Sequence, residues 1–189
     1  QRLDGPAISP DGEQAVVAVT RYEVKDDEGI TDLWLVPTDG GDARQLTTYS
    51  GSDSSPAWSP DGRYVAFVSE RGDDEKSQIY IIPVGGGEAR RLTDVPTGAS
   101  APKWFPDSSA VAFISSIYED AADWEEMAER LKAESESKVS AMTWDQAPIS
   151  WWDRWLDERK PHLYRIGLEA SEPQPITPGS GVHLLVTGA

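Results

Sequence analysis

The chain has 189 residues, of which 38% are hydrophobic and 26% are charged, and this suits one globular domain with a sizeable core. Asp and Glu number 33 against 17 Lys and Arg, and a formal net charge of −16 repels nucleic acid and anionic lipid, so we expect neither as a partner. The absence of cysteine excludes disulfides, thiol catalysis and cysteine-based zinc sites, and no apolar run is long enough to span a membrane.

Composition constrains the cellular location only weakly. A cysteine-free chain fits a reducing compartment, and no basic segment followed by an apolar one opens the sequence. We therefore expect a cytoplasmic protein, with the periplasm as the alternative because the chain begins at Gln1 and a leader can have been removed. The acidity indicates either a solvated surface or adaptation to high salt, and the sequence does not separate the two.

A turn sequence recurs three times along the chain. It begins at Ser9 and Ser59 as Ser-Pro-Asp-Gly and at Phe105 as Phe-Pro-Asp-Ser, with spacings of 50 and 46 residues, and an apolar run follows each copy. A period near 45 residues with several short strands in each repeat is typical of β-propeller blades. Closed propellers typically contain about four to eight blades, so three repeats predict a partial propeller.

The second repeat shows the predicted blade most clearly. Residues 56–59 form an expected inner strand, and Pro60-Asp61-Gly62 forms a tight turn in which Pro fixes φ and Gly accepts a left-handed conformation. Residues 64–69 and 78–82 are rich in β-branched and aromatic residues and predict the second and third strands. Residues 89–93 predict the outer strand.

The other two repeats follow the same plan. In each repeat the apolar anchors of the last two strands are 13 residues apart, at Leu33 and Leu46, Ile79 and Leu92, and Leu163 and Ile176. We expect blade 1 at about 5–48, blade 2 at about 55–94, blade 3 at about 101–178, and a tail or the start of a further blade at 179–189. The fold class is therefore all-β, with three four-stranded antiparallel blades.

The third blade is predicted to carry a helix-containing insertion at about 116–160. Trp124, Met127, Ala128 and Leu131 fall on one helical face, and Asp123 stands where an N-cap is expected. The pairs Glu126 with Arg130 and Glu134 with Lys138 have favourable helical spacing. A helix over about 121–137 follows from this pattern.

Tryptophans gather in and after that helix. Trp144, Trp151, Trp152 and Trp155 lie within twelve residues of one another, and Trp124 precedes them in the helix. These five are the candidate contacts for a neighbouring domain or partner, because apolar side chains on a surface mark interaction sites. The alternative is that they pack the insertion onto the propeller rim.

The chain offers no predicted catalytic constellation. Gly-x-Ser-x-Gly is absent, and His162 and His183 are interpreted as structural. The acidic runs 26–28 and 73–75 lack the ligand order of an EF-hand and are interpreted as solvated loops, and 85–87 is interpreted as a hairpin turn and not a phosphate-binding loop. We therefore predict no catalytic residue, no metal site and no cofactor.

The repeats resemble those of two protein groups. Trp58-Ser59-Pro60-Asp61-Gly62 and the strands and Gly-Gly-x-Ala-Arg-x-Leu-Thr ending that follow it resemble the WD40-type repeats of TolB-like proteins and of the prolyl oligopeptidase family of serine peptidases. The segment 151–164, with Trp-Trp-Asp-Arg-Trp ahead of His-Leu-Tyr, is similar to a segment in acylaminoacyl-peptidase-like and dipeptidyl-peptidase-like propellers.

The peptidase resemblance implies a noncatalytic N-terminal propeller that restricts access to a C-terminal α/β-hydrolase domain. The implied partners are that catalytic domain and a short or N-terminally blocked peptide substrate; the parent protein is then a serine hydrolase. The alternatives are a TolB-like propeller that binds protein and a free-standing module that completes a ring as a homo-oligomer, since unpaired blade edges invite pairing.

Overall fold

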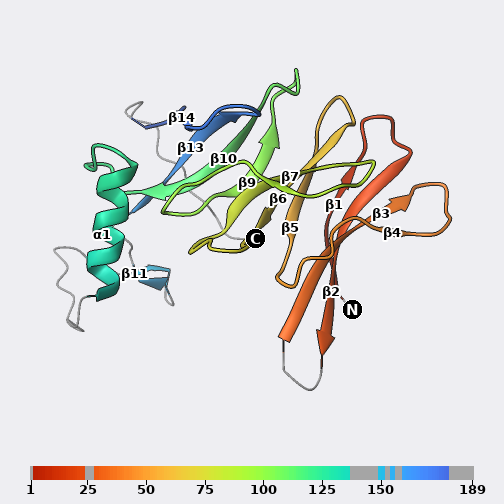
Figure 1. The fold of residues 1–189 in the computed structure, drawn as a ribbon, viewed down its shortest axis with the longest axis horizontal. Helices are drawn as coiled ribbons and strands as arrows, with labels where there is room; N and C mark the ends of the chain where they lie inside the picture. Colours follow the sequence, from red (N-terminus) through yellow and green to blue (C-terminus); the bar gives the residue numbers. More distant parts are fainter. Residues whose placement is uncertain (1, 24–27, 137–148, 152–153, 156–158, 179–189) are drawn as a thin grey trace.

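The computed structural model describes residues 2–23, 28–136, 149–151, 154–155 and 159–178. The chain forms three four-stranded antiparallel sheets that pack face to face in sequence order (Figure 1). The predicted all-β fold of three blades with a helical insertion in the third is confirmed. No helix in the described ranges is long and apolar enough to cross a membrane.

Each blade is a meander in which consecutive strands pair, except where the insertion interrupts the third. Blade 1 contains β1 (Arg2–Ile8), β2 (Gln14–Glu23), β3 (Glu28–Pro37) and β4 (Arg44–Gln45). Blade 2 contains β5 (Ser54–Trp58), β6 (Tyr64–Ser69), β7 (Gln78–Pro83) and β8 (Arg90–Arg91). Blade 3 contains β9 (Ser100–Trp104), β10 (Ala110–Ile117), β13 (Lys160–Gly167) and β14 (Gln174–Pro175).

The 13-residue spacing has a direct cause in the hydrogen bonding. The amides of Leu46 and Thr47 both donate to the carbonyl of Leu33, at 2.7 and 3.3 Å, while the Thr47 hydroxyl accepts the Leu33 amide at 2.9 Å. Thr93 forms the same hydrogen bonds with Ile79 in blade 2, and Thr177 forms them with Leu163 in blade 3. It ends regular pairing after two residues, which is why the outer strands are shorter than predicted.

The repeated turn is stabilised by its own side chains. The Ser59 hydroxyl donates to the Asp61 carboxylate at 2.6 Å and accepts the Tyr64 amide at 2.9 Å, and Ser9 and Asp11 pair in the same way in blade 1. The hydroxyl of Ser59 lowers the pKa of Asp61. Gly62 adopts φ +71°, a conformation that favours glycine.

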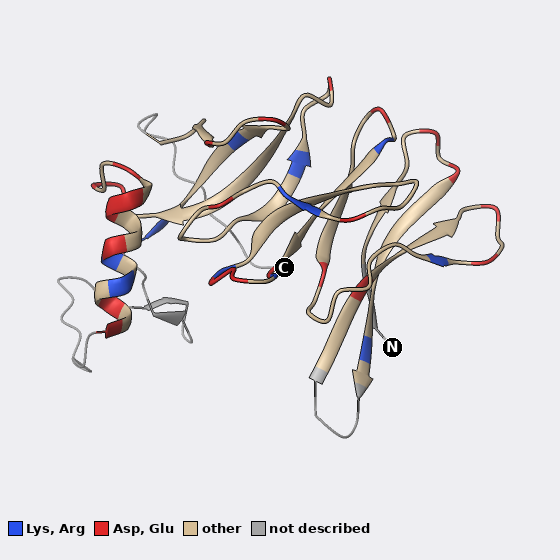
Figure 2. Ribbon diagram, viewed as in Figure 1, with Lys and Arg blue, Asp and Glu red and all other residues tan. Residues whose placement is uncertain are grey.

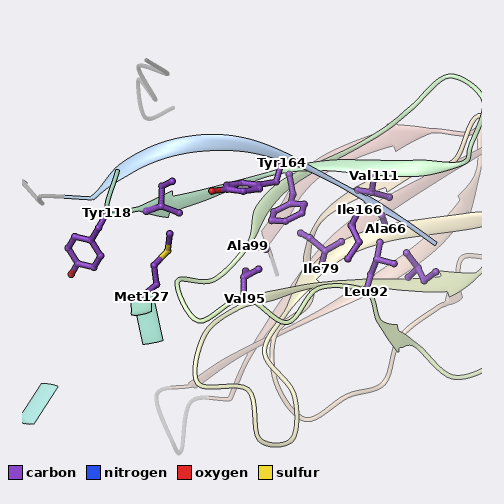
Figure 3. Packing of buried hydrophobic residues seen from close by; sticks show 13 residues of the cluster. Ala66, Ile79, Leu92, Val95, Ala99, Val111, Tyr118, Met127, Tyr164 and Ile166 are labelled. Carbon is purple, nitrogen blue, oxygen red and sulfur yellow. The ribbon is translucent and has the colours of Figure 1, made fainter. Parts of the chain in front are cut away.

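Apolar side chains fill the two seams between the blades. One cluster joins blades 1 and 2, with Val16 and Leu33 against Val65 and Phe67. The other joins blades 2 and 3 and includes Tyr164 (Figure 3). Acidic residues lie mostly in the loops and the helix, whereas several strands carry Lys or Arg (Figure 2).

The insertion begins after β10 and contains α1 (Trp124–Glu136). Asp123 caps it as predicted, since the Glu126 amide donates to the Asp123 carboxylate at 2.9 Å. The predicted Glu126–Arg130 pair forms, whereas Lys138, the predicted partner of Glu134, lies outside the described residues. Met127 is buried and anchors the helix to the core of blade 3 (Figure 3).

Candidate functional site at the faces of the blades

A tryptophan on the first strand of one blade bonds to the main chain of the blade before it. The Trp58 indole donates to the carbonyl of Ala7 at 2.9 Å, and the Trp104 indole donates to the carbonyl of Ala57 at 3.0 Å. Both tryptophans stand three residues before the Asp of the repeated turn. The first strands of neighbouring blades therefore pack together, β1 with β5 and β5 with β9.

An arginine on the outer strand of one blade bonds to the main chain of the blade that follows it. The Arg44 guanidinium donates to the carbonyl of Val84 in blade 2 at 2.7 Å, and the Arg90 guanidinium donates to the carbonyl of Leu168 in blade 3 at 2.9 Å. Gln174 occupies the equivalent position in blade 3. Each seam is thus hydrogen-bonded near its inner and its outer margin, with apolar packing between.

The two end faces of the stack are uncovered in the described part of the chain. Ile8 occupies the position of Trp58 and Trp104, and its side chain is 57% exposed. Ile176, at the other end, is 41% exposed, although the equivalent Leu46 and Leu92 are only 8% and 6% exposed. Both faces therefore present apolar surface of the kind that the seams bury.

Two buried polar atoms lie on the open face of blade 1. Asp32 Oδ1 and Trp34 Nε1 are shielded from solvent and have no hydrogen-bond partner among the described residues. The other oxygen of Asp32 forms a 2.7 Å ion pair with Arg21. Strand alternation places Asp32 and Trp34 on the face whose blade 2 equivalents, Gln78 and Tyr80, turn toward blade 1.

A charged and aromatic cluster, here called the Arg71 cluster, closes one end of blade 2. Arg71 donates to both oxygens of the fully buried Asp53 at 2.7 and 2.8 Å, and its guanidinium lies over the rings of Tyr49, Phe67 and Tyr80. Cation–π contacts of this kind contribute most where water is excluded. The cluster ties the loop before β5 to the loop after β6.

Asp74 belongs to the same end of blade 2 and corrects the interpretation of 73–75 as a solvated loop. Its carboxylate is buried and accepts hydrogen bonds from the Tyr80 hydroxyl at 2.7 Å and from Arg91 at 2.6 Å. Burial alone would raise the pKa of Asp74, but the hydrogen bonds from Tyr80, the Arg71 amide and Arg91 outweigh it and hold the pKa below its usual range. Burial and the bond to Asp74 raise the pKa of Tyr80. The other acidic run falls mostly outside the described residues.

His162 is buried at the start of β13. Its Nδ1 lies 3.1 Å from the hydroxyl of Thr177, and its Nε2 lies 3.3 Å from a carboxylate oxygen of Glu119, which also pairs with Lys160. The residues at the start and end of the insertion are thereby joined. The described residues hold no group of three potential metal ligands, and His183 lies outside them.

The five predicted tryptophans are not brought together as one described surface. Trp124 packs on Tyr164 with ring centroids 5.0 Å apart, and burial raises the pKa of Tyr164 to about 12. The backbone of Trp151 lies in β11 (Ile149–Trp151), which pairs with β12 (Arg154–Trp155). Trp144 and Trp152 lie outside the described residues.

Sequence reasoning did not assign the seam roles of Trp58 and Trp104. The signal was present, because a tryptophan recurs at the same distance before the turn in two repeats and is replaced by Ile8 in the first. The indole of each tryptophan donates to a main-chain carbonyl, and every residue has one, so the sequence alone does not identify the acceptor residue.

These features define a β-propeller segment of three stacked blades with hydrogen-bonded seams. The chain belongs to the family of the tricorn protease N-terminal β-propeller domain, whose model matches residues 29–147. Propeller domains of this kind occur in peptidase-like and in TolB-like proteins, which confirms the predicted resemblance.

Three individual proteins illustrate the likeness. The chain is 38% identical over 71 residues to dipeptidyl-peptidase 5 of Porphyromonas gingivalis, covering 38% of this chain and 10% of that protein. It is 53% identical over 36 residues to the Tol-Pal system protein TolB of Nitratidesulfovibrio vulgaris, covering 19% and 8%. The Pyrococcus horikoshii acylaminoacyl peptidase superposes with a TM-score of 0.63 at 14% identity, over 92% of this chain and 25% of that one, which shows a shared fold.

Proposed function

We propose that the three blades form the noncatalytic propeller part of a serine peptidase that acts on short or N-terminally blocked peptides. In this proposal the propeller restricts access to a C-terminal α/β-hydrolase domain. The matched region makes up 10% of the length of dipeptidyl-peptidase 5, so the catalytic partner and the peptide substrate are part of the proposal.

The uncovered end faces carry this proposal. Ile8 and Ile176 occupy positions that a neighbouring blade covers elsewhere in the stack, so both ends are suited to further blades of the same kind. Burying apolar surface stabilises by about 25 cal/mol per Å², which favours ring completion over exposure. A closed ring excludes folded proteins and admits narrow peptides.

The seams determine how strictly such a ring excludes large substrates. Trp104 joins blade 3 to blade 2 near the inner margin, where the first strands converge. Loosening this contact is expected to admit longer peptides without changing the chemistry at a distant catalytic serine.

The first experiment reads the coding sequence on both sides of this chain. We expect further Ser-Pro-Asp-Gly turns and then Gly-x-Ser-x-Gly, and labelling of the full-length protein by a fluorophosphonate. Trp104→Ala in that protein should raise kcat/KM for a thirty-residue peptide relative to an acetylated dipeptide, whereas Asp39→Asn, in an exposed turn of blade 1 away from that seam, should leave the ratio unchanged. A coding sequence without a hydrolase, or a protein that resists labelling, would exclude the peptidase.

A TolB-like binding module is the second candidate, and the 53% identity to TolB over 36 residues favours it. It predicts no fluorophosphonate labelling and a stable complex with another protein. Self-association into a ring is the third candidate. Sedimentation of the chain as a monomer at all concentrations would exclude it, and sedimentation as a discrete oligomer would support it.

A second part of the proposal concerns the insertion. We expect Trp151, Trp152 and Trp155 to contact the neighbouring domain. Replacing all three with Ser in the full-length protein should weaken domain association or change the preferred peptide length. Trp124→Ser is the control, because Trp124 packs within blade 3 and should alter stability without altering that preference.

A further inference from the structure

A hollow lies where blade 1 meets blade 2, beside the first strands. It has a volume of about 210 Å³, and its walls come from β1, from the hairpin of β2 and β3, and from the start of β5. Four of its lining residues carry aliphatic hydroxyls: Thr20, Thr31, Ser54 and Ser55. None of the described residues that line it is charged, although a quarter of the chain is. Its ligand is therefore expected to be neutral and rich in hydrogen-bonding groups.

The hollow exists because the first blade has a longer hairpin. β2 continues to Glu23, whereas β6 ends at Ser69, the position equivalent to Val19. The extended end of the β2–β3 hairpin projects past the neighbouring sheet (Figure 1). In the seam between blades 2 and 3, where the hairpin is shorter, Glu70 takes the place of Thr20. The paired hydroxyls of Thr20 and Thr31 are thus a feature of the first seam.

An aromatic ring lies on the projecting hairpin. Tyr22 is exposed and lies across Gly29, where an added Cβ would come within 3.1 Å of its ring. Glycine at 29 therefore lets the ring lie close to the hairpin. Tyr22 also lines the hollow, so one wall is an aromatic surface suited to an apolar side chain.

Hydrogen-bonding capacity remains in the walls. The hydroxyls of Thr20 and Thr31 are 2.9 Å apart and bond to each other. A hydroxyl has one donor and two acceptor positions, so this pair retains one donor and further acceptor positions. Pairing of β5 with β6 is interrupted between Ser54 and Ala57, and Ser55 there adopts φ +52°. Such a bulge leaves a main-chain unit outside the ladder.

We infer that this hollow binds one or two units of an uncharged, extended peptide. Hydroxyls and a strand interrupted at a bulge match the alternating donors and acceptors of a peptide main chain, as in strand addition. The volume is below the roughly 300–1,000 Å³ of a typical small-molecule pocket, which suits a short segment. The inference rests on the proposed function in that it identifies a propeller subsite for the peptide substrate.

The test uses the 189-residue chain labelled with ¹⁵N and N-acetyl-trialanine amide as the probe. We expect amide shifts at Thr20, Thr31, Ser54 and Ser55 that saturate. Thr20→Val combined with Thr31→Val keeps the shape and removes the hydroxyls, and should weaken binding at least tenfold. Ser100→Ala is the matched control, because Ser100 is equivalent to Ser54 in the other seam, and it should bind as the unmodified chain does.

Shifts that scatter over the surface, or that survive the double valine variant, would overturn the inference. So would equal shifts with maltotriose, which would identify a carbohydrate site. If the double valine variant unfolds, the test uses Gly29→Ala in its place. The added methyl group displaces the Tyr22 ring and should weaken binding. Binding of trialanine needs no hydrolase domain, so this inference and the proposed function fail separately.

Discussion

Asp53 and Arg71 form an ion pair in which both carboxylate oxygens accept from one guanidinium nitrogen and the carboxylate is fully buried. Breaking a buried pair leaves an uncompensated charge, which costs about 3–5 kcal/mol. Arg71→Met should therefore lower the free energy of unfolding by about that amount, measured by urea denaturation.

The control for this prediction is the exposed pair of Arg90 and Glu169. Glu169→Gln should change stability by less than about 1 kcal/mol, because exposed pairs contribute little. Adding Asp53→Leu to Arg71→Met should recover part of the loss. A loss equal to that of the surface control would show that the Arg71 cluster contributes no net stability.

Stability should fall in acid because several carboxyl groups have lowered pKa values. The hydroxyl of Ser59 lowers the pKa of Asp61, and hydrogen bonds hold the pKa of Asp74 low against its burial. A group whose pKa is lower in the folded than in the unfolded chain stabilises the fold above the unfolded value, near 4, and this contribution disappears as the pH falls through the folded value. We expect the free energy of unfolding to decline below about pH 4.5.

Asp74→Asn tests which group contributes to that decline. The variant should be less stable at neutral pH, and its stability should fall less steeply in acid because one titrating group is gone. Asp73→Asn, at the exposed neighbouring position, should keep the original slope. If the free energy of unfolding falls equally steeply with pH in the unmodified chain and in both variants, Asp74 does not contribute to the loss of stability in acid.

The seam hydrogen bond of Trp104 should be measurable by itself. Trp104→Phe keeps an aromatic ring and removes the donor to Ala57, and a buried hydrogen bond contributes about 1 kcal/mol, with more lost if the carbonyl stays unpaired. Trp34→Phe is the comparison, because the Trp34 indole nitrogen has no partner among the described residues, and should cost less. Equal losses in thermal unfolding would contradict a role for the seam bond.

Backbone strain at the start of blade 3 predicts a stabilising substitution. Ala101 is exposed and adopts φ +52°, a conformation that costs an L-residue about 1–2 kcal/mol and glycine very little. Ala101→Gly should raise the free energy of unfolding by up to about 1 kcal/mol, since glycine loses more entropy on folding. Ala112→Gly, within β10, should instead be destabilising.

The sequence predicted the blades because each depends on local patterns. Leu33 and Leu46 are directly hydrogen-bonded, so their spacing is repeated in all three blades and survives the insertion in the third. The N-cap at Asp123 was equally predictable, because a cap bonds to an amide three residues away.

The contacts between loops and blades could not be predicted in the same way. Arg71 contacts Asp53 and Tyr49 across sequence separations that match no regular helical or strand spacing. Asp74 resembled a solvated acid because its neighbours in the chain are acidic, whereas its burial depends on Tyr80 and Arg91. Such roles become visible only in three dimensions.

The Trp58 and Trp104 bonds also bear on how a propeller gene can evolve. Each indole requires a carbonyl oxygen and no particular side chain in the blade before it. A duplicated blade therefore brings its own attachment group and finds an acceptor whatever sequence precedes it. Mutational drift in the older blade leaves that acceptor intact, so copies can diverge, be gained or change order while the joint between them is preserved.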